Sequence, residues 1–217
     1  MHASAPLLDV DLILFDLDNT LYPRGLGLWR EIDDRIRLFV GQFLGISPAE
    51  AARVQKHYWL NYGTTIAGLM AEYRIEPAAY LAFVHDVPLA PYLGFNPTLD
   101  ALLTALPQRK AIFTNATARH AHNVLAALGV DRHFQHVVGF EEVGYVSKPH
   151  PLAYERCLAL VDVSPQRCVF IEDSAVNLPP ARALGMKTVL VGDGSADADH
   201  TIPHIEALGR LFGLDGA

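Results

Sequence analysis

Acidic residues follow two short apolar segments of this chain, at positions where chemically active side chains often gather. Asp16 and Asp18 come directly after the apolar segment 12–15. Spaced by two on an extended segment, they are expected to project to the same side. Glu172 and Asp173 follow a later apolar segment in the same way. Clustered carboxylates repel one another and take up protons unless a hard cation neutralises them, so this pattern predicts a cation site.

Three further polar residues lie at comparable positions and suit a phosphate group. Thr114 and Asn115 end another apolar segment, and Lys148 stands in the loop after the next one. Oxygen ligands favour Mg²⁺, which combines a few carboxylates with water and phosphate oxygens, and Lys148 and Thr114 would hold the other phosphate oxygens. One carboxylate can then attack as a nucleophile, and a second one two residues on can protonate the leaving oxygen. These residues predict phosphoryl transfer.

Each feature has a plainer interpretation when it is taken alone. An Asp-x-Asp pair at a strand end is commonly a turn or a cap, and Thr114 with Asn115 could cap a helix. Lys148 alone would be a solvated surface charge, and Glu172 with Asp173 could cap the next helix. Their order along the chain, each at a predicted strand end, favours chemistry.

The elements that must position these residues are strands buried on both faces, which are continuous apolar runs in a sequence. Such runs occupy residues 12–15, 111–113, 136–140, 168–171 and 188–191. Helical patterns separate the later runs, at residues 121–128, 151–161 and 181–184. This alternation predicts an α/β fold with a parallel sheet and right-handed crossovers. Because the carboxyl ends of parallel strands share one edge, the polar residues are expected to meet there.

The stretch from Leu21 to about Pro91 interrupts this alternation and contains helical patterns without a predicted strand. The patterns cover residues 32–43, 65–73 and 77–85, and a further helix is predicted to begin at a capping box, Ser47 to Glu50. We interpret this stretch as an all-helical insertion over the sheet. The expected division is a core of residues 1–21 and 92–217 and an insertion of residues 22–91.

Composition limits the classes of function. The 217 residues carry 17 Lys and Arg against 24 Asp and Glu, for a formal net charge of -7, and 51% of them are hydrophobic. Such a chain is too apolar to be disordered, and a negative charge without a basic run argues against binding a nucleic acid polymer. Neither a signal peptide in Met1 to Pro6 nor a membrane-spanning run is recognisable, and two cysteines cannot build a disulfide framework. We expect a cytoplasmic protein without membrane association.

The ordered motifs resemble those of the haloacid dehalogenase-like hydrolase superfamily. They are Phe15-Asp16-Leu17-Asp18-Asn19-Thr20-Leu21, Thr114-Asn115, Lys148-Pro149, and Glu172-Asp173-Ser174 with Asn177. The resemblance spans Asp11 to about Leu208 and implies a Rossmann-like core with an inserted helical cap. It makes Asp16 the nucleophile and Asp18 the general acid and base. Because the dehalogenases proper lack that second acid and need no metal, Asp18 favours a phosphatase or mutase.

The same resemblance implies a magnesium site and a phosphate site. The implied magnesium ligands are Asp16, the backbone carbonyl of Asp18, and Asp173, with Glu172 close by. The implied phosphate-binding residues are Thr114, Asn115 and Lys148. The expected cofactor is therefore Mg²⁺, and the expected partner is a small-molecule phosphate monoester.

A closer similarity is to the pyrimidine 5'-nucleotidase branch, and it is carried by Tyr62-Gly63-Thr64-Thr65 in the insertion, together with Tyr22-Pro23 and Phe113-Thr114-Asn115-Ala116. It implies hydrolysis of UMP-like or CMP-like monophosphates to nucleoside and phosphate. Tyr58 and Tyr62 share a helix face where an aromatic ring could stack on a base, and Thr64 could bond a pyrimidine edge or a ribose. Alternatively, these tyrosines and Trp59 form the core of the cap.

Two other functions stay open. A relative could act on a sugar phosphate or another small phosphometabolite as a phosphatase or a mutase. A phospho-accepting switch also combines acids, a hydroxyl and a lysine, but the acids stand here in the wrong order for a receiver. The histidines are expected to have surface or structural roles, including the pairs His120 and His122, His133 and His136, and His200 and His204, while His85 could face the site. The sequence does not indicate an oligomeric state.

Overall fold

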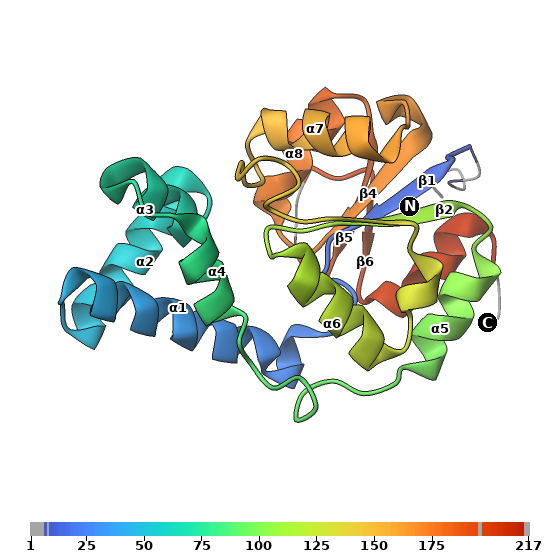
Figure 1. The fold of residues 1–217 in the computed structure, drawn as a ribbon. Coiled ribbons are helices and arrows are strands. Elements are labelled where there is room, and N and C mark those ends of the chain that lie inside the picture. The colour runs from blue at the N-terminus through green and yellow to red at the C-terminus, as the bar shows by residue number, and fades with distance from the viewer. Residues whose placement is uncertain (1–6, 8, 195–196, 215–217) are drawn as a thin grey trace.

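A parallel β-sheet forms the centre of the structure (Figure 1). The computed structural model describes residues 7, 9–194 and 197–214, so residues 1–6, where no signal peptide is recognisable, lie outside the described range. Within that range the strands are β1 (Leu12–Phe15), β2 (Arg109–Phe113), β3 (His136–Val138), β4 (Cys168–Glu172), β5 (Lys187–Val191) and β6 (His200–Ile202). They pair in the order β3-β2-β1-β4-β5-β6, always in parallel. The predicted Rossmann-like α/β fold is confirmed.

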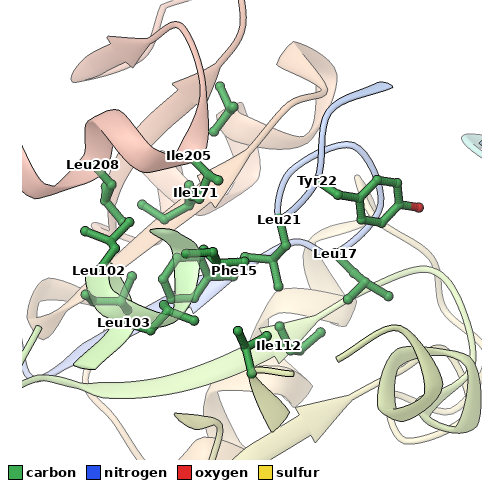
Figure 2. Close-up of a cluster of buried hydrophobic side chains, with 14 of the residues drawn as sticks. Phe15, Leu17, Leu21, Tyr22, Leu102, Leu103, Ile112, Ile171, Ile205 and Leu208 are labelled. Atoms are coloured by element: carbon green, nitrogen blue, oxygen red, sulfur yellow. The ribbon is translucent and has the colours of Figure 1, made fainter. Parts of the chain in front are cut away.

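Burial on both faces explains why the strands are continuous apolar runs. In β1, Leu12 and Leu14 belong to one hydrophobic cluster, while Ile13 and Phe15 belong to a second cluster on the opposite face. Figure 2 shows part of the second cluster, with Phe15 among residues of several helices. All four side chains are fully buried, as are those of β4 beside it.

Helices cover both faces of the sheet (Figure 1). On the side of Phe15 lie α5 (Pro97–Ala105), α6 (Ala118–Leu128) and the 3-10 helix η5 (Ile205–Phe212). On the side of Leu14 lie α7 (Pro151–Val161) and α8 (Leu178–Ala183). Short 3-10 turns are η1 (Arg24–Leu26), η2 (Asp131–His133), η3 (Pro165–Arg167) and η4 (Ala175–Asn177).

The main differences from the expectation concern α5 and β3. Helix α5 is present although no element was predicted there. Strand β3 ends at Val138 rather than at Phe140, because the chain turns away where the Gly139 amide bonds to the Glu142 carboxylate at 3.0 Å. Phe140 then packs into a hydrophobic cluster of the helical insertion instead of the sheet.

Four helices, α1 (Leu28–Leu44), α2 (Pro48–Tyr62), α3 (Thr65–Tyr73) and α4 (Pro77–Val84), stand beside the sheet as a separate group, which we call the α1–α4 unit (Figure 1). The capping box predicted at Ser47 is confirmed, since its hydroxyl accepts from the Glu50 amide and the Glu50 carboxylate accepts from the Ser47 amide. Helix α3 has the predicted bounds, and α1 includes the predicted residues 32–43 and ends at Leu44, with Gly45 as its C-cap. None of the helices in the described part of the chain combines the length and apolar character that a membrane span needs.

The α1–α4 unit meets the core at a close backbone approach. Gly63 has a φ of 83°, and a Cβ atom there would lie 2.9 Å from Pro149 Cδ. A side chain at this position would therefore push the helical unit away from the loop that carries Lys148. Next to it, the Thr64 hydroxyl lies 3.4 Å from the Ser147 hydroxyl.

Candidate active site

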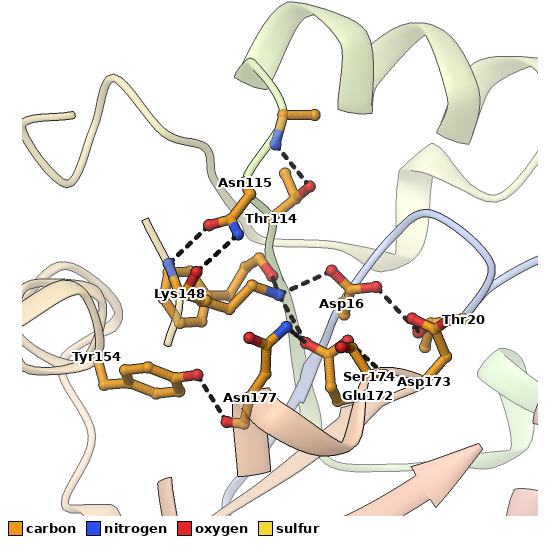
Figure 3. A network of polar contacts seen from close by, with 12 residues as sticks. Asp16, Thr20, Thr114, Asn115, Lys148, Tyr154, Glu172, Asp173, Ser174 and Asn177 are labelled. Carbon is orange, nitrogen blue, oxygen red and sulfur yellow. Dashed lines mark hydrogen bonds and ion pairs between the residues drawn. The ribbon is translucent and has the colours of Figure 1, made fainter. Parts of the chain in front are cut away.

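The sheet order brings the predicted residues to one place. From β1 the chain proceeds outward to β2 and β3, and β4 then returns to the other side of β1. Ligands of open α/β sheets bind beyond the carboxyl ends of the strands at such a switch point. Asp16 follows β1, Thr114 follows β2, and Glu172 ends β4. These residues, far apart in sequence, are therefore neighbours in space (Figure 3).

Lys148 is buried at the centre of this group (Figure 3). Its ammonium group donates hydrogen bonds to Asp16 Oδ1 at 2.8 Å, to Glu172 Oε2 at 2.9 Å and to the Phe113 carbonyl oxygen at 2.9 Å. These bonds use all three protons of the ammonium group. Only 1% of Lys148 is exposed, which excludes the interpretation as a solvated surface charge.

Three carboxylates converge beside this lysine. Asp16, Glu172 and Asp173 each place an oxygen atom within 4.8 Å of the others. The Thr20 hydroxyl donates to Asp16 Oδ2 at 3.0 Å, and Arg24 forms an ion pair with Asp173 at 3.0 Å. The structure thus places Asp16, Glu172 and Asp173 together as the sequence predicts, and it adds Thr20 and Arg24 as contacts that were not predicted.

Burial and neighbouring charges shift the pKa values in this group. Burial, aided by the Glu172 carboxylate and opposed by Lys148, raises the pKa of Asp16 to about 7. Burial also raises the pKa of Glu172 and of Asp173. Burial alone would lower the pKa of Lys148, but Asp16 and Glu172 outweigh it and raise that pKa. With all three acids ionised, the group would carry one more negative charge than Lys148 and Arg24 can neutralise, and the raised pKa values express this repulsion.

The cluster of Asp16, Glu172 and Asp173 has the chemistry of a site for a divalent metal ion. Closely spaced carboxylate oxygens are the donors that Mg²⁺ prefers, and a divalent cation would offset the repulsion that raises their pKa values. The cleft is bordered by Asp16, Glu172 and Asp173, so a cation could enter. The donor set fits Mg²⁺. The Asp18 carboxylate is not part of it, and the predicted contact through the Asp18 backbone carbonyl stays a prediction.

Asp18 points to different partners from Asp16. Its Oδ1 accepts a hydrogen bond from the Tyr22 hydroxyl at 2.5 Å and lies 3.2 Å from His120 Nε2. The expectation that both acids project to one side fails to describe these contacts, because β1 ends at Phe15 and Asp18 already lies in a turn. Burial would raise the pKa of Asp18, but His120 and Tyr22 hold it below its usual value.

The predicted phosphate-binding residues divide into two kinds. The Thr114 hydroxyl accepts from the Ala116 amide at 3.0 Å and keeps its own proton for another acceptor. The Asn115 side chain instead pairs with the backbone of Lys148, accepting from its amide at 2.8 Å and donating to its carbonyl oxygen at 3.1 Å. Asn115 thereby fixes the loop that presents Lys148 (Figure 3).

A cleft of about 590 Å³ lies between this edge of the sheet and the α1–α4 unit. Thr64 borders the cleft, and its hydroxyl also caps α3 by accepting from the Ala67 amide at 3.2 Å. Tyr62 is not among the residues described as lining it, and its hydroxyl bonds to Glu72 at 3.0 Å. The aromatic side chains that border the cleft on this side include Trp29 and Trp59.

His120 departs from the expectation of a surface or structural role, because it lies against Asp18 at the site. His85 borders the cleft, in line with the expectation that it could face the site. His133 Nε2 lies 2.7 Å from Asp100, and His204 Nδ1 lies 3.0 Å from Glu206, so both have acidic partners that the sequence spacing did not indicate. One signal in the sequence could have revealed His120. It stands in the first turn of the helix that follows β2, and that helix begins at the edge of the sheet where ligands bind.

Fold and site together define an α/β protein with an acidic, lysine-bridged site at a switch point. The model of the haloacid dehalogenase-like hydrolases matches residues 10–185. The chain belongs to this family of hydrolases.

Several curated proteins are similar along most of the chain. Phosphate metabolism protein 8 of Saccharomyces cerevisiae is 27% identical over 194 residues, which cover 82% of this chain and 60% of the yeast protein, less than two thirds of its length. Phosphoglycolate phosphatase of Chromobacterium violaceum is 26% identical over 201 residues, covering 87% of this chain and 88% of that protein. Glyceraldehyde 3-phosphate phosphatase of Methanopyrus kandleri is 28% identical over 200 residues, covering 85% of each.

Solved structures share the fold. A HAD phosphatase from Thermococcus onnurineus superposes with a TM-score of 0.62 at 21% identity, covering 96% of this chain and 100% of that one. L-2-haloacid dehalogenase from Xanthobacter autotrophicus superposes with a TM-score of 0.59 at 17% identity and the same coverage.

Proposed function

We propose that this protein is a magnesium-dependent phosphatase that hydrolyses pyrimidine nucleoside 5'-monophosphates through an aspartyl-phosphate on Asp16. The observation that carries the proposal is the buried Lys148, which holds Asp16 and Glu172 at 2.8 and 2.9 Å beside Asp173. A nucleophilic carboxylate, a cation-binding acid and a fixed positive charge are the parts that phosphoryl transfer requires. Membership of the hydrolase family supports this reading of the site.

In the first step, a carboxylate oxygen of Asp16 attacks the phosphorus and the ester P–O bond breaks. The electron pair of that bond goes to the leaving oxygen, which receives a proton from the Asp18 carboxyl group; the negative charge of the bound phosphate favours the protonated form of Asp18, against the lowering of its pKa by His120 and Tyr22. In the second step, Asp18 accepts a proton from water as the water oxygen attacks phosphorus. The acyl phosphate bond then breaks, Asp16 is regenerated as a carboxylate, and inorganic phosphate leaves.

The remaining residues bind and orient the phosphate. Lys148 supplies positive charge, and the Thr114 hydroxyl has a proton to donate to a phosphate oxygen. Asn115 positions the Lys148 loop through the two bonds to its backbone. Magnesium, when bound by Asp16, Asp173 and the Asp18 backbone carbonyl near Glu172, would supply further charge to neutralise the phosphate.

The α1–α4 side of the cleft carries aromatic rings, which suit a leaving group that contains a planar base. Trp29 and Trp59 border the cleft and are 37% and 52% exposed. Exposed indole rings at a cleft are available to stack on a base, an interaction that tolerates different bases. The cleft of about 590 Å³ is within the range for sites that bind small molecules. We propose that residues 22–91 act as the cap that selects the substrate, and that Thr64 borders the nucleoside.

Phosphate release tests this function. The substrates are UMP, CMP, dUMP, AMP, a sugar phosphate and pyridoxal phosphate, each with Mg²⁺ and with EDTA. We expect release that needs Mg²⁺ and is fastest with the pyrimidine nucleotides. Equal release in EDTA would contradict the role of the metal, and absence of release from every ester would contradict the phosphatase assignment.

A second candidate is a phosphatase for another small phosphometabolite. Relatives at 26% and 28% identity are named phosphoglycolate phosphatase and glyceraldehyde 3-phosphate phosphatase. Fastest release from the sugar phosphate in the same panel would keep the proposed chemistry of Asp16 and replace the substrate. We also infer a cytoplasmic location and no nucleic acid polymer as partner, from the composition given above.

A further inference from the structure

His120 joins the site through the carboxylate of Asp18. It stands in the first turn of α6, where it is 2% exposed, and its Nε2 lies 3.2 Å from Asp18 Oδ1. The Tyr22 hydroxyl donates to the same oxygen at 2.5 Å. Two side chains from different elements therefore hold one oxygen of a single carboxylate.

The second carboxylate oxygen of Asp18, Oδ2, differs from Oδ1 in its hydrogen bonds. Within the described part of the chain, the hydrogen bonds to this carboxylate end on Oδ1. Asp18 itself borders the cleft. A carboxyl group that exchanges protons with a ligand needs one oxygen directed at that ligand, and anchoring Oδ1 leaves Oδ2 for this purpose.

His85, at the end of the α1–α4 unit, packs against the ring of His120. His85 follows α4, and its ring stacks on the His120 ring with centroids 4.5 Å apart and planes inclined by 24°. His85 borders the cleft as well. This contact connects the α1–α4 unit to Asp18 through one intervening side chain.

We propose that His120 is a positioning residue that, with Tyr22, fixes Asp18 by Oδ1 and directs Oδ2 to the leaving oxygen, and that His85 holds the His120 ring in place. The inference rests on the proposed function, since it assigns the orientation of the acid used there. His120 acts through Asp18 and does not itself contact the substrate.

The experiment compares two phosphoesters whose leaving groups differ in their need for a proton. An alkyl phosphate releases a strongly basic alkoxide and depends on general acid catalysis, whereas p-nitrophenyl phosphate releases a stable anion. The parameter is kcat/KM, which reports the steps up to loss of the leaving group. The alkyl ester is UMP, or whichever alkyl phosphate the unchanged enzyme hydrolyses fastest.

The variants are His120→Leu, His120→Gln and His85→Ala, with His122→Leu as the control. Gln retains an N–H near the position of Nε2, whereas Leu removes the donor at similar size. His122 lies on the same helix but is exposed. We expect His120→Leu to lower kcat/KM for the alkyl ester about 100-fold and that for p-nitrophenyl phosphate less than about 5-fold. His120→Gln should restore most of the loss, His85→Ala should cause a smaller loss, and the control should behave as the unchanged enzyme.

Specific outcomes would overturn the proposal. Equal losses for both esters would assign His120 a purely structural role, as would a Gln variant that folds but is no better than Leu. Thermal unfolding of each variant shows whether it folds, and His85→Ala tests the arrangement without altering His120. If the unchanged enzyme hydrolyses neither ester, the proposed function fails and this inference fails with it. If it hydrolyses both and His120→Leu loses neither, only this inference fails.

Discussion

The two walls of the cleft differ in the chemistry of their side chains and in how far those side chains are buried. The wall at the sheet edge consists of charged and hydroxyl side chains that are almost completely buried, among them Asp16, Lys148 and Glu172. Each is held by hydrogen bonds to residues from other strands or loops. Strands behind them leave these groups little room to move, which suits the proposed attack of Asp16 on a phosphate.

The wall formed by the α1–α4 unit combines apolar and aromatic side chains with polar ones. Ile32, Ile36, Trp59 and Leu81 border the cleft there. Among the polar residues, Asp33 is already bonded to Gln55 and Arg37 within the same unit. The indoles are partly exposed, whereas the acids opposite are not. Such a wall can contribute contact area for a leaving group without taking part in bond breaking.

Under the proposed function, the two walls would serve separate parts of catalysis. Changes at the sheet edge should lower kcat, because they remove groups used in the transition state. Changes on the helical wall should raise KM with little effect on kcat, because they remove contacts that substrate and transition state share. His85 and His120 are the exception, since they connect one wall to the other.

The strongest test of the sheet-edge wall is Asp16→Asn. The change is nearly isosteric and removes the proposed nucleophile, so we expect kcat to fall about 10⁴-fold or more while the fold persists. Steady-state phosphate release and thermal unfolding provide the measurements. Asp11→Asn, at an exposed ion pair with Arg167, is the control and should keep full activity. Substantial magnesium-dependent turnover by Asp16→Asn would show that another group is the nucleophile.

Lys148→Ala should have the next largest effect. Removing the buried ammonium leaves Asp16 and Glu172 without their shared partner, so we expect a loss of about 3 kcal/mol in unfolding free energy. We also expect kcat/KM to fall about 100-fold. Denaturant unfolding and kinetics measure the two effects. Lys110→Ala, another buried lysine whose ammonium bonds to backbone carbonyl oxygens, should lose stability without losing activity. Unchanged KM and kcat in Lys148→Ala would contradict its assigned role.

The proton held by Asp16 provides a test of the metal. Because burial raises the pKa of Asp16 from 3.8 to about 7, the folded protein keeps a proton that the unfolded chain releases between those values. The stability of the metal-free protein should therefore fall as the pH rises through this range, by about 4 kcal/mol. Mg²⁺ should oppose the fall, since it replaces the proton. Thermal unfolding in EDTA and in Mg²⁺ measures this, and Asp16→Asn should weaken the pH dependence. Rising stability of the metal-free protein over that range would disprove the expectation.

The smallest expected effect lies on the helical wall. Trp59→Ala removes a stacking surface, so KM for UMP should rise about 10-fold with kcat nearly unchanged. Leu60→Ala, at the neighbouring exposed position, is the matched control and should change neither constant. Tyr62→Ala separates two hypotheses, because the sequence motif assigns Tyr62 to the substrate while the structure bonds its hydroxyl to Glu72. A large fall in kcat for Trp59→Ala would contradict the division between the walls.

Features that depend on neighbours along the chain could be predicted from the residues alone. The apolar run 12–15 predicted β1, and the capping box at Ser47 predicted the start of α2. Polar residues directly after buried strands also indicated which groups would meet, because parallel strands bring their carboxyl ends to one edge. Asp16 and Glu172 could be found in this way.

Contacts between side chains of different elements could not be predicted in this way. Asp18 turns toward Tyr22 and His120, and His120 receives His85 from a different unit. Trp59 rather than Tyr62 borders the cleft, because Glu72 of the next helix binds the Tyr62 hydroxyl. Periodicity fixes the face of a single element, but contacts between elements depend on how those elements pack, and packing is set by all of them together.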